Sequence, residues 1–346
     1  MIRSTMAGGL LGKRFQAALA ALAMGFFVIC GLPGTSKAEK VVHSLDWVPY
    51  GRDAGFYAAE AKGFMKAEGI DLEITRGKGS SETVKRLTVG DADYGTPDAG
   101  VVAISRSRGI KVKMIGAFHA RTPMTIVTVK GRGINTVKDL AGKTLADASF
   151  SSTHKVFPAL ARKHGVDPKS VKWEFMSPAA FGAAGLAGRV DAWGEYATNE
   201  PSMRKAAKQA GKELIIFRFA DLGVDIYSNT TTATEDKLKN NPDQVRRYMR
   251  GMYKGIAWAV KHPEEAVDII LKRVPVLNRD TAIQHWQIAI DHLLTAAAKK
   301  HGIGHLSREK VTFTRDIIAG AYNLKTKPSV DDLYTVKYLP KVMAKR

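Results

Sequence analysis

The sequence predicts an α/β protein with two lobes, a ligand cleft between the lobes and a helical C-terminal region. Three observations support this prediction. Short runs rich in β-branched and aromatic residues alternate with helical patterns, which is typical of largely parallel sheets. A second series of such runs begins near Thr125, and from Glu235 onward the pattern is almost entirely helical.

The first series alternates regularly. Its strand patterns lie at 41–47, 71–75, 92–95 and 112–118. Its helical patterns lie at 55–67, 80–89 and 99–108. A glycine follows closely on each of these helical patterns, which is the usual signal that a helix has ended.

The second series and the C-terminal region follow the same logic. Strand patterns lie at 125–129, 144–148, 171–175, 190–193 and 213–217, and an extended segment lies at 224–232. The helical patterns between these strands lie at 137–141, 151–164, 179–187 and 200–210. Further helices are predicted at 243–261, 263–273, 279–298, 308–324 and 330–337.

The composition narrows the class of protein. The chain has 346 residues, of which 45% are hydrophobic and 25% charged, as in a globular protein with a buried core. This excludes a disordered chain, a collagen-like fibre and a multi-span membrane protein. The formal charge of +20 is spread along the chain. Nucleic-acid modules usually cluster their charge with aromatic residues, so we predict a solvated basic surface and no nucleic-acid partner.

Residues 1–38 have the order of a cleaved signal peptide. Basic residues including Lys13 precede an apolar run at 15–32, and small residues precede a cut after Ala38. The run is short for a membrane span, and an uncleaved anchor is the alternative. Cys30, the only cysteine, lies in this segment, and its lipidation is a further alternative. A mature chain without cysteine suits an oxidising compartment, so we predict a periplasmic location.

Several motifs together resemble a known family. Residues 46–59 read DWVPYGRDAGFYAA, followed by KGF at 62–64 and EGIDLEI at 68–74. Further matches are GDADYG at 90–95, LAGKT at 140–144 and GRVDA at 188–192. In this combination the chain resembles the periplasmic solute-binding proteins that serve ABC importers for thiamine-pyrimidine precursors, sulfonates, taurine and nitrate. The resemblance covers roughly residues 41–275.

The resemblance implies a two-lobed periplasmic binding protein of type II, a hinged monomer in which the chain crosses twice between lobes. Lobe 1 would hold residues 39–122 and 223–346, and lobe 2 residues 123–222. A small-molecule solute and an ABC permease would be its partners. The family also includes a pyrimidine-synthesis enzyme with a cysteine-rich motif and a sacrificial histidine. Here the predicted mature chain has no cysteine, and Asp53 stands where that branch tends to have histidine, so we predict no enzyme activity.

The first lobe offers candidate ligand contacts after its strands, where open α/β sheets bind ligands. Trp47 and Tyr50 can stack on a flat ring, although Trp47 can also be core. Asp53 can accept hydrogen bonds from an amino group or cap the next helix.

Two further loops of the first lobe carry polar candidates. Ser80 and Ser81 open a helix after two glycines, and can bind an anion or a carbonyl or simply cap the helix. Thr96 and Asp98 follow the third strand and can line the cleft floor, with capping of helix 99–108 as the alternative for Asp98.

The second lobe contributes hydroxyls and one acid. Ser149, Ser151 and Ser152 lie at a predicted helix N-terminus, where N–H groups can bind a ligand acceptor or need only capping. The remaining candidates follow the strand at 190–193 or lie near the return crossing: Glu195, Tyr196, Asn199 and Asp225. No cofactor and no metal site are predicted, because the nine histidines are scattered without a cysteine partner.

The predicted mechanism is closure of the cleft on a solute that both lobes contact, because such a ligand favours the closed arrangement. A flat neutral or cationic heterocycle would use Trp47, Tyr50, Asp53 and Glu195. An anion such as a sulfonate, nitrate or aromatic carboxylate would use the helix N-termini near Ser80 and Ser151. A sensor or scavenging module without a transporter would share the fold, and a pyrimidine-synthesis enzyme is the alternative of another class.

Overall fold

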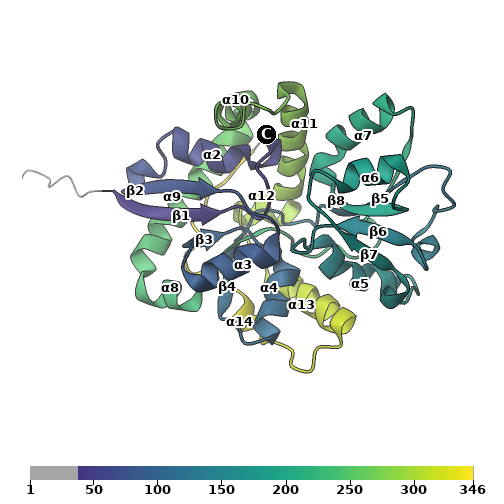
Figure 1. Ribbon diagram of the computed structural model, residues 1–346. Helices are drawn as coiled ribbons and strands as arrows, with labels where there is room; N and C mark the ends of the chain where they lie inside the picture. The colour runs from purple at the N-terminus through teal and green to yellow at the C-terminus, as the bar shows by residue number, and fades with distance from the viewer. Residues whose placement is uncertain (1–37, 346) are drawn as a thin grey trace, which may run out of the picture. The chain divides into compact units, whose positions relative to one another are not determined.

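The computed structural model describes residues 38–345. The predicted signal peptide at 1–38, with Cys30, therefore lies outside the described residues except for Ala38. The described chain contains two five-stranded sheets, and helices flank both of them (Figure 1). The predicted α/β class with a helical C-terminal region is confirmed.

The first sheet has the order β2-β1-β3-β10-β4. Its strands are β1 (Glu39–Ser44), β2 (Ile70–Thr75), β3 (Tyr94–Gly95), β4 (Val112–Ala117) and β10 (Thr230–Thr234). Strand β1 pairs in parallel with β2 and β3, whereas β10 runs antiparallel between β3 and β4. Because β10 comes from far along the chain, the first lobe is completed only after the chain has returned from the second.

The second sheet has the order β7-β6-β8-β5-β9. Its strands are β5 (Met124–Val129), β6 (Thr144–Asp147), β7 (Lys172–Phe175), β8 (Ala192–Tyr196) and β9 (Leu214–Arg218). Strand β6 is parallel to β7 and β8, and β5 is antiparallel to β8 and β9. The chain therefore passes between the sheets at 118–123 and again at 219–229.

Helices cover each sheet. Those built around the first sheet are α2 (Ala54–Ala61), α3 (Ser80–Val89), α4 (Ala99–Ser107), α8 (Glu235–Asn240), α9 (Pro242–Lys261), α10 (Pro263–Arg273), α11 (Arg279–Leu293), α12 (Ala296–His301) and α14 (Val330–Leu333). Those of the second sheet are α5 (Thr153–Lys163), α6 (Phe181–Ala187) and α7 (Glu200–Gln209). Short 3-10 turns are η1 (Gly51–Asp53), η2 (Lys66–Glu68), η3 (Val137–Leu140), η4 (Pro168–Ser170) and η5 (Ala197–Asn199).

Helix α13 (Arg308–Tyr322) contacts both lobes, because it packs against α4 on one side and α5 on the other. It is the yellow helix at the bottom of Figure 1. A side chain on Gly100 of α4 would lie 2.9 Å from Ile318 and 3.1 Å from Val156, so the glycine permits this close packing. Across α13, Arg162 Nε donates to the Ala321 carbonyl at 3.2 Å. One apolar cluster thus runs from the first lobe into the second.

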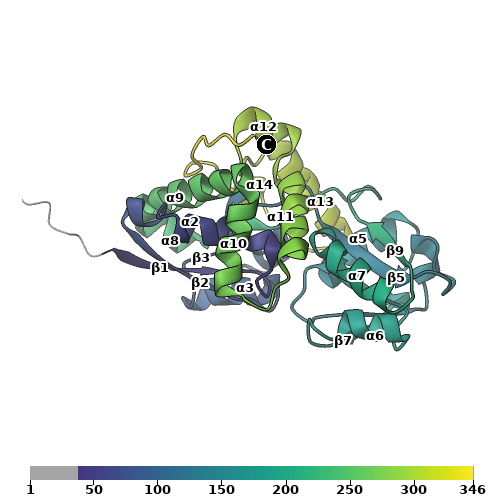
Figure 2. The same cartoon turned by 90° about the horizontal axis from the view of Figure 1, so that it is seen from above.

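Three C-terminal predictions were wrong in detail. The helix predicted at 330–337 ends at Leu333, because the next residue, Tyr334, is extended. The helix predicted at 279–298 is two helices, because Thr295 caps a new one by accepting a hydrogen bond from the Ala298 N–H. Only Thr230–Thr234 forms a strand near the extended segment predicted at 224–232, since the preceding residues form the crossing between lobes. Helices α11 and α7, one from each lobe, contact each other, and Figure 2 shows them side by side from above. In Figure 1 they lie at the top and α13 at the bottom, so the lobes are joined on two sides.

Candidate functional site

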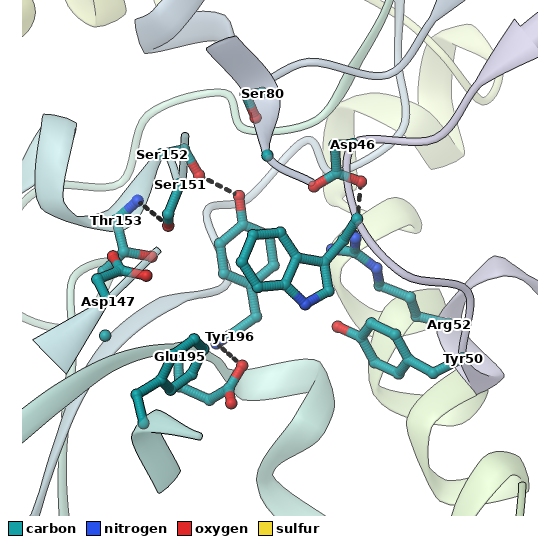
Figure 3. Close-up of a pocket in the computed structure, with 14 residues that line it drawn as sticks. Asp46, Tyr50, Arg52, Ser80, Asp147, Ser151, Ser152, Thr153, Glu195 and Tyr196 are labelled. Atoms are coloured by element: carbon teal, nitrogen blue, oxygen red, sulfur yellow. Dashed lines mark hydrogen bonds and ion pairs between the residues drawn. The ribbon is translucent and has the colours of Figure 1, made fainter. Parts of the chain in front are cut away.

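A cavity lies between the two sheets. Its lining comes from both lobes (Figure 3). The first lobe contributes Asp46, Trp47, Tyr50, Arg52, Gly79 and Ser80, and the second Asp147, Ser151, Ser152, Thr153, Phe181, Gly194, Glu195 and Tyr196.

Strand ends place most of these residues. Asp46 and Trp47 follow β1, and Ser80 opens α3 after β2. Asp147 is the last residue of β6, and Glu195 lies at the end of β8. The ends of parallel strands meet at one edge of a sheet, and each of these edges faces the other lobe, so a cavity forms between the lobes.

Among residues 38–345, Arg52 is the one cation that lines the cavity, and it is already paired. Its Nη2 donates to Asp46 Oδ1 at 2.6 Å, and its Nε lies 3.5 Å from Asp53 Oδ1. Arg52 is 2% exposed and Asp46 6%. The guanidinium also lies over the rings of Tyr50 and Tyr196, 4.8 Å and 5.2 Å from their centroids. Little of its charge is left for a ligand.

Asp147 occupies the N-terminus of α5. Its Oδ2 accepts from the His154 N–H at 3.0 Å, and its Oδ1 accepts from the Ala148 N–H at 2.8 Å. A Cβ on Gly194 would lie 2.7 Å from Asp147 Oδ2, so the glycine makes room for the carboxylate. Helix N-termini attract anions, but here the protein supplies its own carboxylate. A ligand anion at the same place would be repelled.

Glu195 is the third carboxyl group in the cavity. It accepts hydrogen bonds from the Tyr196 N–H and from Asn199 Nδ2, both at 3.0 Å. Burial raises the pKa of this carboxyl group to about 7, against the opposing effect of both hydrogen bonds. Near neutral pH, Glu195 can therefore accept a hydrogen bond as a carboxylate or donate one as an acid.

Aromatic side chains form two walls. The rings of Trp47 and Phe181, from different lobes, lie 6.4 Å apart and are tilted by 48°. The hydroxyl groups of Tyr50 and Tyr196 are bonded to Thr198 at 2.8 Å and Ser152 at 2.7 Å. Flat rings prefer such aromatic surroundings, so the shape and the polar groups together suit a planar ligand.

The lobes touch on both sides of the cavity. The Tyr50–Thr198 hydrogen bond and the bond between Ser202 Oγ and His285 Nε2, at 2.8 Å, join them on one side. On the other, the Ser81 N–H donates to the Phe150 carbonyl at 3.3 Å. Gly79, with φ of 141°, is required there because a Cβ would lie 2.2 Å from the Phe150 oxygen. The structure is therefore a closed arrangement.

Half of the predicted site residues line this cavity and half do not. Those that line it are Trp47, Tyr50, Ser80, Ser151, Ser152, Glu195 and Tyr196. Ser81 lies next to the cavity and faces a different cleft, together with the exposed Ser149. Asn199 supports Glu195 from outside the lining.

The other four predicted residues have structural partners. Asp53 accepts from the Tyr50 N–H at 3.0 Å, and Asp98 caps α4 by accepting from the Gly100 N–H at 2.8 Å. The carbonyl of Thr96 accepts from Asn229 Nδ2 at 2.7 Å. Asp225, at the return crossing, accepts from Lys310 Nζ at 3.1 Å.

Sequence reasoning missed seven lining residues: Asp46, Arg52, Gly79, Asp147, Thr153, Phe181 and Gly194. Asp46 and Asp147 follow or end strands, so the rule that located Trp47 could have located them. Nothing local identifies Phe181, because it reaches the cavity only through the docking of one lobe on the other.

Neither a metal-binding cluster nor a membrane-spanning helix is present in residues 38–345. No group of three or more histidine, cysteine or acidic side chains in this part of the chain is arranged to hold a metal ion. Within the same residues, no helix has both the length and the apolar character needed to cross a membrane.

Residues 52–266 match the family described as NMT1/THI5 like, and the chain belongs to this family. It is 22% identical over 308 residues to the riboflavin-binding protein RibY of Chloroflexus aurantiacus, covering 87% of this chain and 86% of that one. It is 23% identical to a formylaminopyrimidine-binding protein of Halalkalibacterium halodurans, with 75% and 79% covered. It is also 22% identical to a 4-amino-5-hydroxymethyl-2-methylpyrimidine phosphate synthase of Legionella pneumophila, with 70% and 77% covered.

Among solved structures, the alkanesulfonate-binding protein SsuA of Xanthomonas axonopodis bound to MOPS is similar. The TM-score is 0.68 at 16% identity, covering 87% of this chain and 99% of that one. The likeness shows that the two proteins share the fold of periplasmic binding proteins, and the predicted fold family is confirmed.

Proposed function

We propose that the chain is the exported solute-binding component of an ABC importer, and that it captures a small, flat heterocycle with amino groups by closure of its lobes. A pyrimidine precursor of thiamine is the type of solute we expect. The observation that carries the proposal is the charge of the cavity. Three carboxyl groups line it, and its one guanidinium is paired with one of them at 2.6 Å.

This charge balance favours hydrogen-bond donors over anions. Asp147 and Glu195 can accept from ligand amino groups, and a charge-assisted hydrogen bond is about twice as strong as a neutral one. Trp47 and Phe181 come from different lobes and lie 6.4 Å apart, so a ring that packs beside this pair contacts both lobes and stabilises the closed arrangement. The names of the riboflavin-binding and formylaminopyrimidine-binding relatives support a planar nitrogen heterocycle.

A thermal-shift screen tests the ligand class. The panel contains 4-amino-5-hydroxymethyl-2-methylpyrimidine, formylaminopyrimidine, riboflavin, alkanesulfonates, nitrate and aromatic carboxylates. A ligand at a hundredfold excess over its Kd stabilises the folded protein by about 2.7 kcal/mol. We expect an aminopyrimidine to give the largest shift and Trp47→Ala to remove most of it, with Phe313→Ala, an exposed aromatic on α13, as the control. An unchanged shift in Trp47→Ala would exclude this cavity.

The variant Glu195→Gln distinguishes a heterocyclic ligand from an anionic one, because the two are expected to change affinity in opposite directions. The variant removes a carboxylate, so it should weaken binding of an aminopyrimidine about tenfold. An anionic ligand would bind more tightly to the same variant, because a repulsive charge has been removed. Glu213→Gln, an exposed glutamate paired with Lys130, is the matched control and should change neither affinity.

Two further measurements test the class and the location. Incubation of the purified protein with the bound heterocycle, followed by mass spectrometry, should recover it unaltered; a new product would favour the synthase activity named for one relative. Exported protein should begin at Glu39. An intact Met1 would contradict the signal peptide, and a lipid on Cys30 would identify a lipoprotein.

A further inference from the structure

A second cleft lies between the lobes, beside the cavity. It is lined by residues of α3, α4, α5 and α13 and of the loop before α5. Ser80 and Ser151 face the cavity, whereas their neighbours Ser81 and Phe150 face this cleft. The Ser81–Phe150 hydrogen bond therefore separates the two spaces.

The floor of the cleft is apolar. Val84, Val101 and Ile104 line it and are themselves at most 5% exposed. The ring of Phe150 stands at the rim and is 44% exposed, although it is large and apolar. A ligand with an apolar group would remove this ring from water, which is favourable in proportion to the apolar area covered.

The rim of the cleft is cationic. Lys85 comes from α3, Arg108 from the end of α4 and Lys155 from α5, and no acidic residue lines the cleft. Within residues 38–345, none of these three cations forms an ion pair. Lys155 Nζ has the ring of His154 at 3.4 Å as its neighbour. These unpaired cations differ from Arg52 of the cavity, which forms an ion pair with Asp46.

The cations come from different lobes. Lys85 and Arg108 belong to the first lobe and Lys155 to the second, so closure brings like charges together. Burial lowers the pKa of the Lys155 ammonium group, and the nearby charge of Arg108 lowers it further, while Asp147 acts in the opposite direction. An anion between the lobes would relieve this repulsion, and it could do so only in the closed arrangement.

We propose that this cleft is a second binding site, that it takes an amphipathic organic anion with a carboxylate or sulfonate on an apolar body, and that its occupation stabilises the closed arrangement. The apolar body covers Phe150 and the floor, and the anionic group lies between Arg108 and Lys155. Because both sites favour the same arrangement, ligands of the cavity and of the cleft bind cooperatively and by the same factor in each direction. This coupling rests on the proposed function of the cavity, whereas binding to the cleft does not.

The test uses 4-phenylbutyrate as the probe and 4-phenylbutanamide, its neutral counterpart, on the purified protein by isothermal titration calorimetry. We expect the carboxylate to bind at least tenfold more tightly than the amide. Arg108→Gln and Lys155→Gln should each weaken its binding about tenfold. Lys172→Gln, an exposed lysine of the second lobe outside the cleft, should leave it unchanged. Equal binding of the amide, or unchanged binding by both cleft variants, would overturn the proposal.

Trp47→Ala distinguishes the two sites. The variant loses one ring contact between the lobes but no group of the cleft, so its affinity for 4-phenylbutyrate should fall far less than its affinity for an aminopyrimidine. An equal fall would mean that the probe enters the cavity instead. If an aminopyrimidine binds but 4-phenylbutyrate does not, the second site is wrong and the function of the cavity stands. If 4-phenylbutyrate binds with the expected dependence on Arg108 and Lys155 while no heterocycle binds, the second site stands alone.

Discussion

The cavity and the cleft lie side by side between the same two lobes, yet their charges are opposite. The cavity has three carboxyl groups and a single guanidinium, which is paired. The cleft has three cations and no acid in its lining. The difference shows that a net charge of +20 describes the surface and not the pocket. A basic protein can therefore hold a site suited to amino groups within a few residues of one suited to anions.

The largest expected effect is on stability, and it comes from comparing the loss of Arg52, the paired cation of the cavity, with the loss of Lys155, an unpaired cation of the cleft. Arg52→Met removes the cation that pairs with the buried carboxyl groups of Asp46 and Asp53, and breaking a buried ion pair costs about 3–5 kcal/mol. Lys155→Met removes a cation that has no acidic partner within residues 38–345, so it should not lower stability. Urea denaturation of both variants measures the difference in the free energy of unfolding. Equal losses of stability in the two variants would mean that the paired cation of the cavity and the unpaired cation of the cleft contribute equally to the free energy of unfolding.

Gly79→Ala tests whether ligand binding requires the lobes to meet at the Ser81–Phe150 contact, which lies between the cavity and the cleft. The added Cβ would lie 2.2 Å from the Phe150 oxygen, so the lobes could not meet there. We expect cavity ligands to bind about a hundredfold more weakly, which corresponds to about 2.7 kcal/mol. Small-angle scattering should show no compaction when ligand is added.

Gly90→Ala is the control for backbone strain. Gly90 also has positive φ, at 84°, but nothing lies within 4 Å of a Cβ placed there. This variant should lose stability and keep its affinity. If Gly90→Ala and Gly79→Ala weaken binding equally, the close approach to Phe150 is irrelevant.

The smallest effect is a pH dependence from Glu195. Its folded pKa of about 7 lies above the ordinary value of 4.5, so the folded state binds more protons between these values. Stability contributed by this group is present below pH 4.5 and is lost as the pH rises to 7. Glu195→Gln has no carboxyl group to titrate, so its free energy of unfolding should not fall in this way. Relative to the original protein it should rise by about 1–2 kcal/mol between pH 4.5 and 7. This value is reduced from the full effect of the pKa shift because the side chain is partly exposed.

Glu213→Gln should have the opposite sign. Its hydrogen bond to Lys130 lowers the pKa of the Glu213 carboxyl group, so its contribution is lost as the pH falls. Thermal denaturation across pH 4–8 measures both variants. A Glu195→Gln profile parallel to that of the original protein would show that this carboxyl group does not titrate in the window.

Local signals in the sequence predict the elements well and the site only in part. The helix predicted at 263–273 has the observed bounds, because proline opens it and its apolar period is strong. Trp47, Ser80, Ser151 and Glu195 could be located because each lies at or near a strand end. Asp98 also follows that rule, but it caps α4. Asp53 accepts from the Tyr50 N–H of the preceding turn and makes no side-chain cap on the next helix, α2.

The rest of the site depends on the docking of one lobe on the other. Phe181 lies opposite Trp47, and Lys155 lies near Arg108, only because the lobes are closed. No local period or motif encodes such distances. The unpaired state of the cleft cations is likewise a property of the assembled structure, since acidic residues are frequent elsewhere in the chain.

The position of α13 has a consequence for biosynthesis. This helix is among the last segments to be made, yet Arg162 of α5 and Val156 reach it across the junction of the lobes. A nascent chain that ends before residue 308 can form both sheets but lacks the segment that joins them at this side. The contacts of α13 with both lobes are therefore added only after the strands of both sheets have been made.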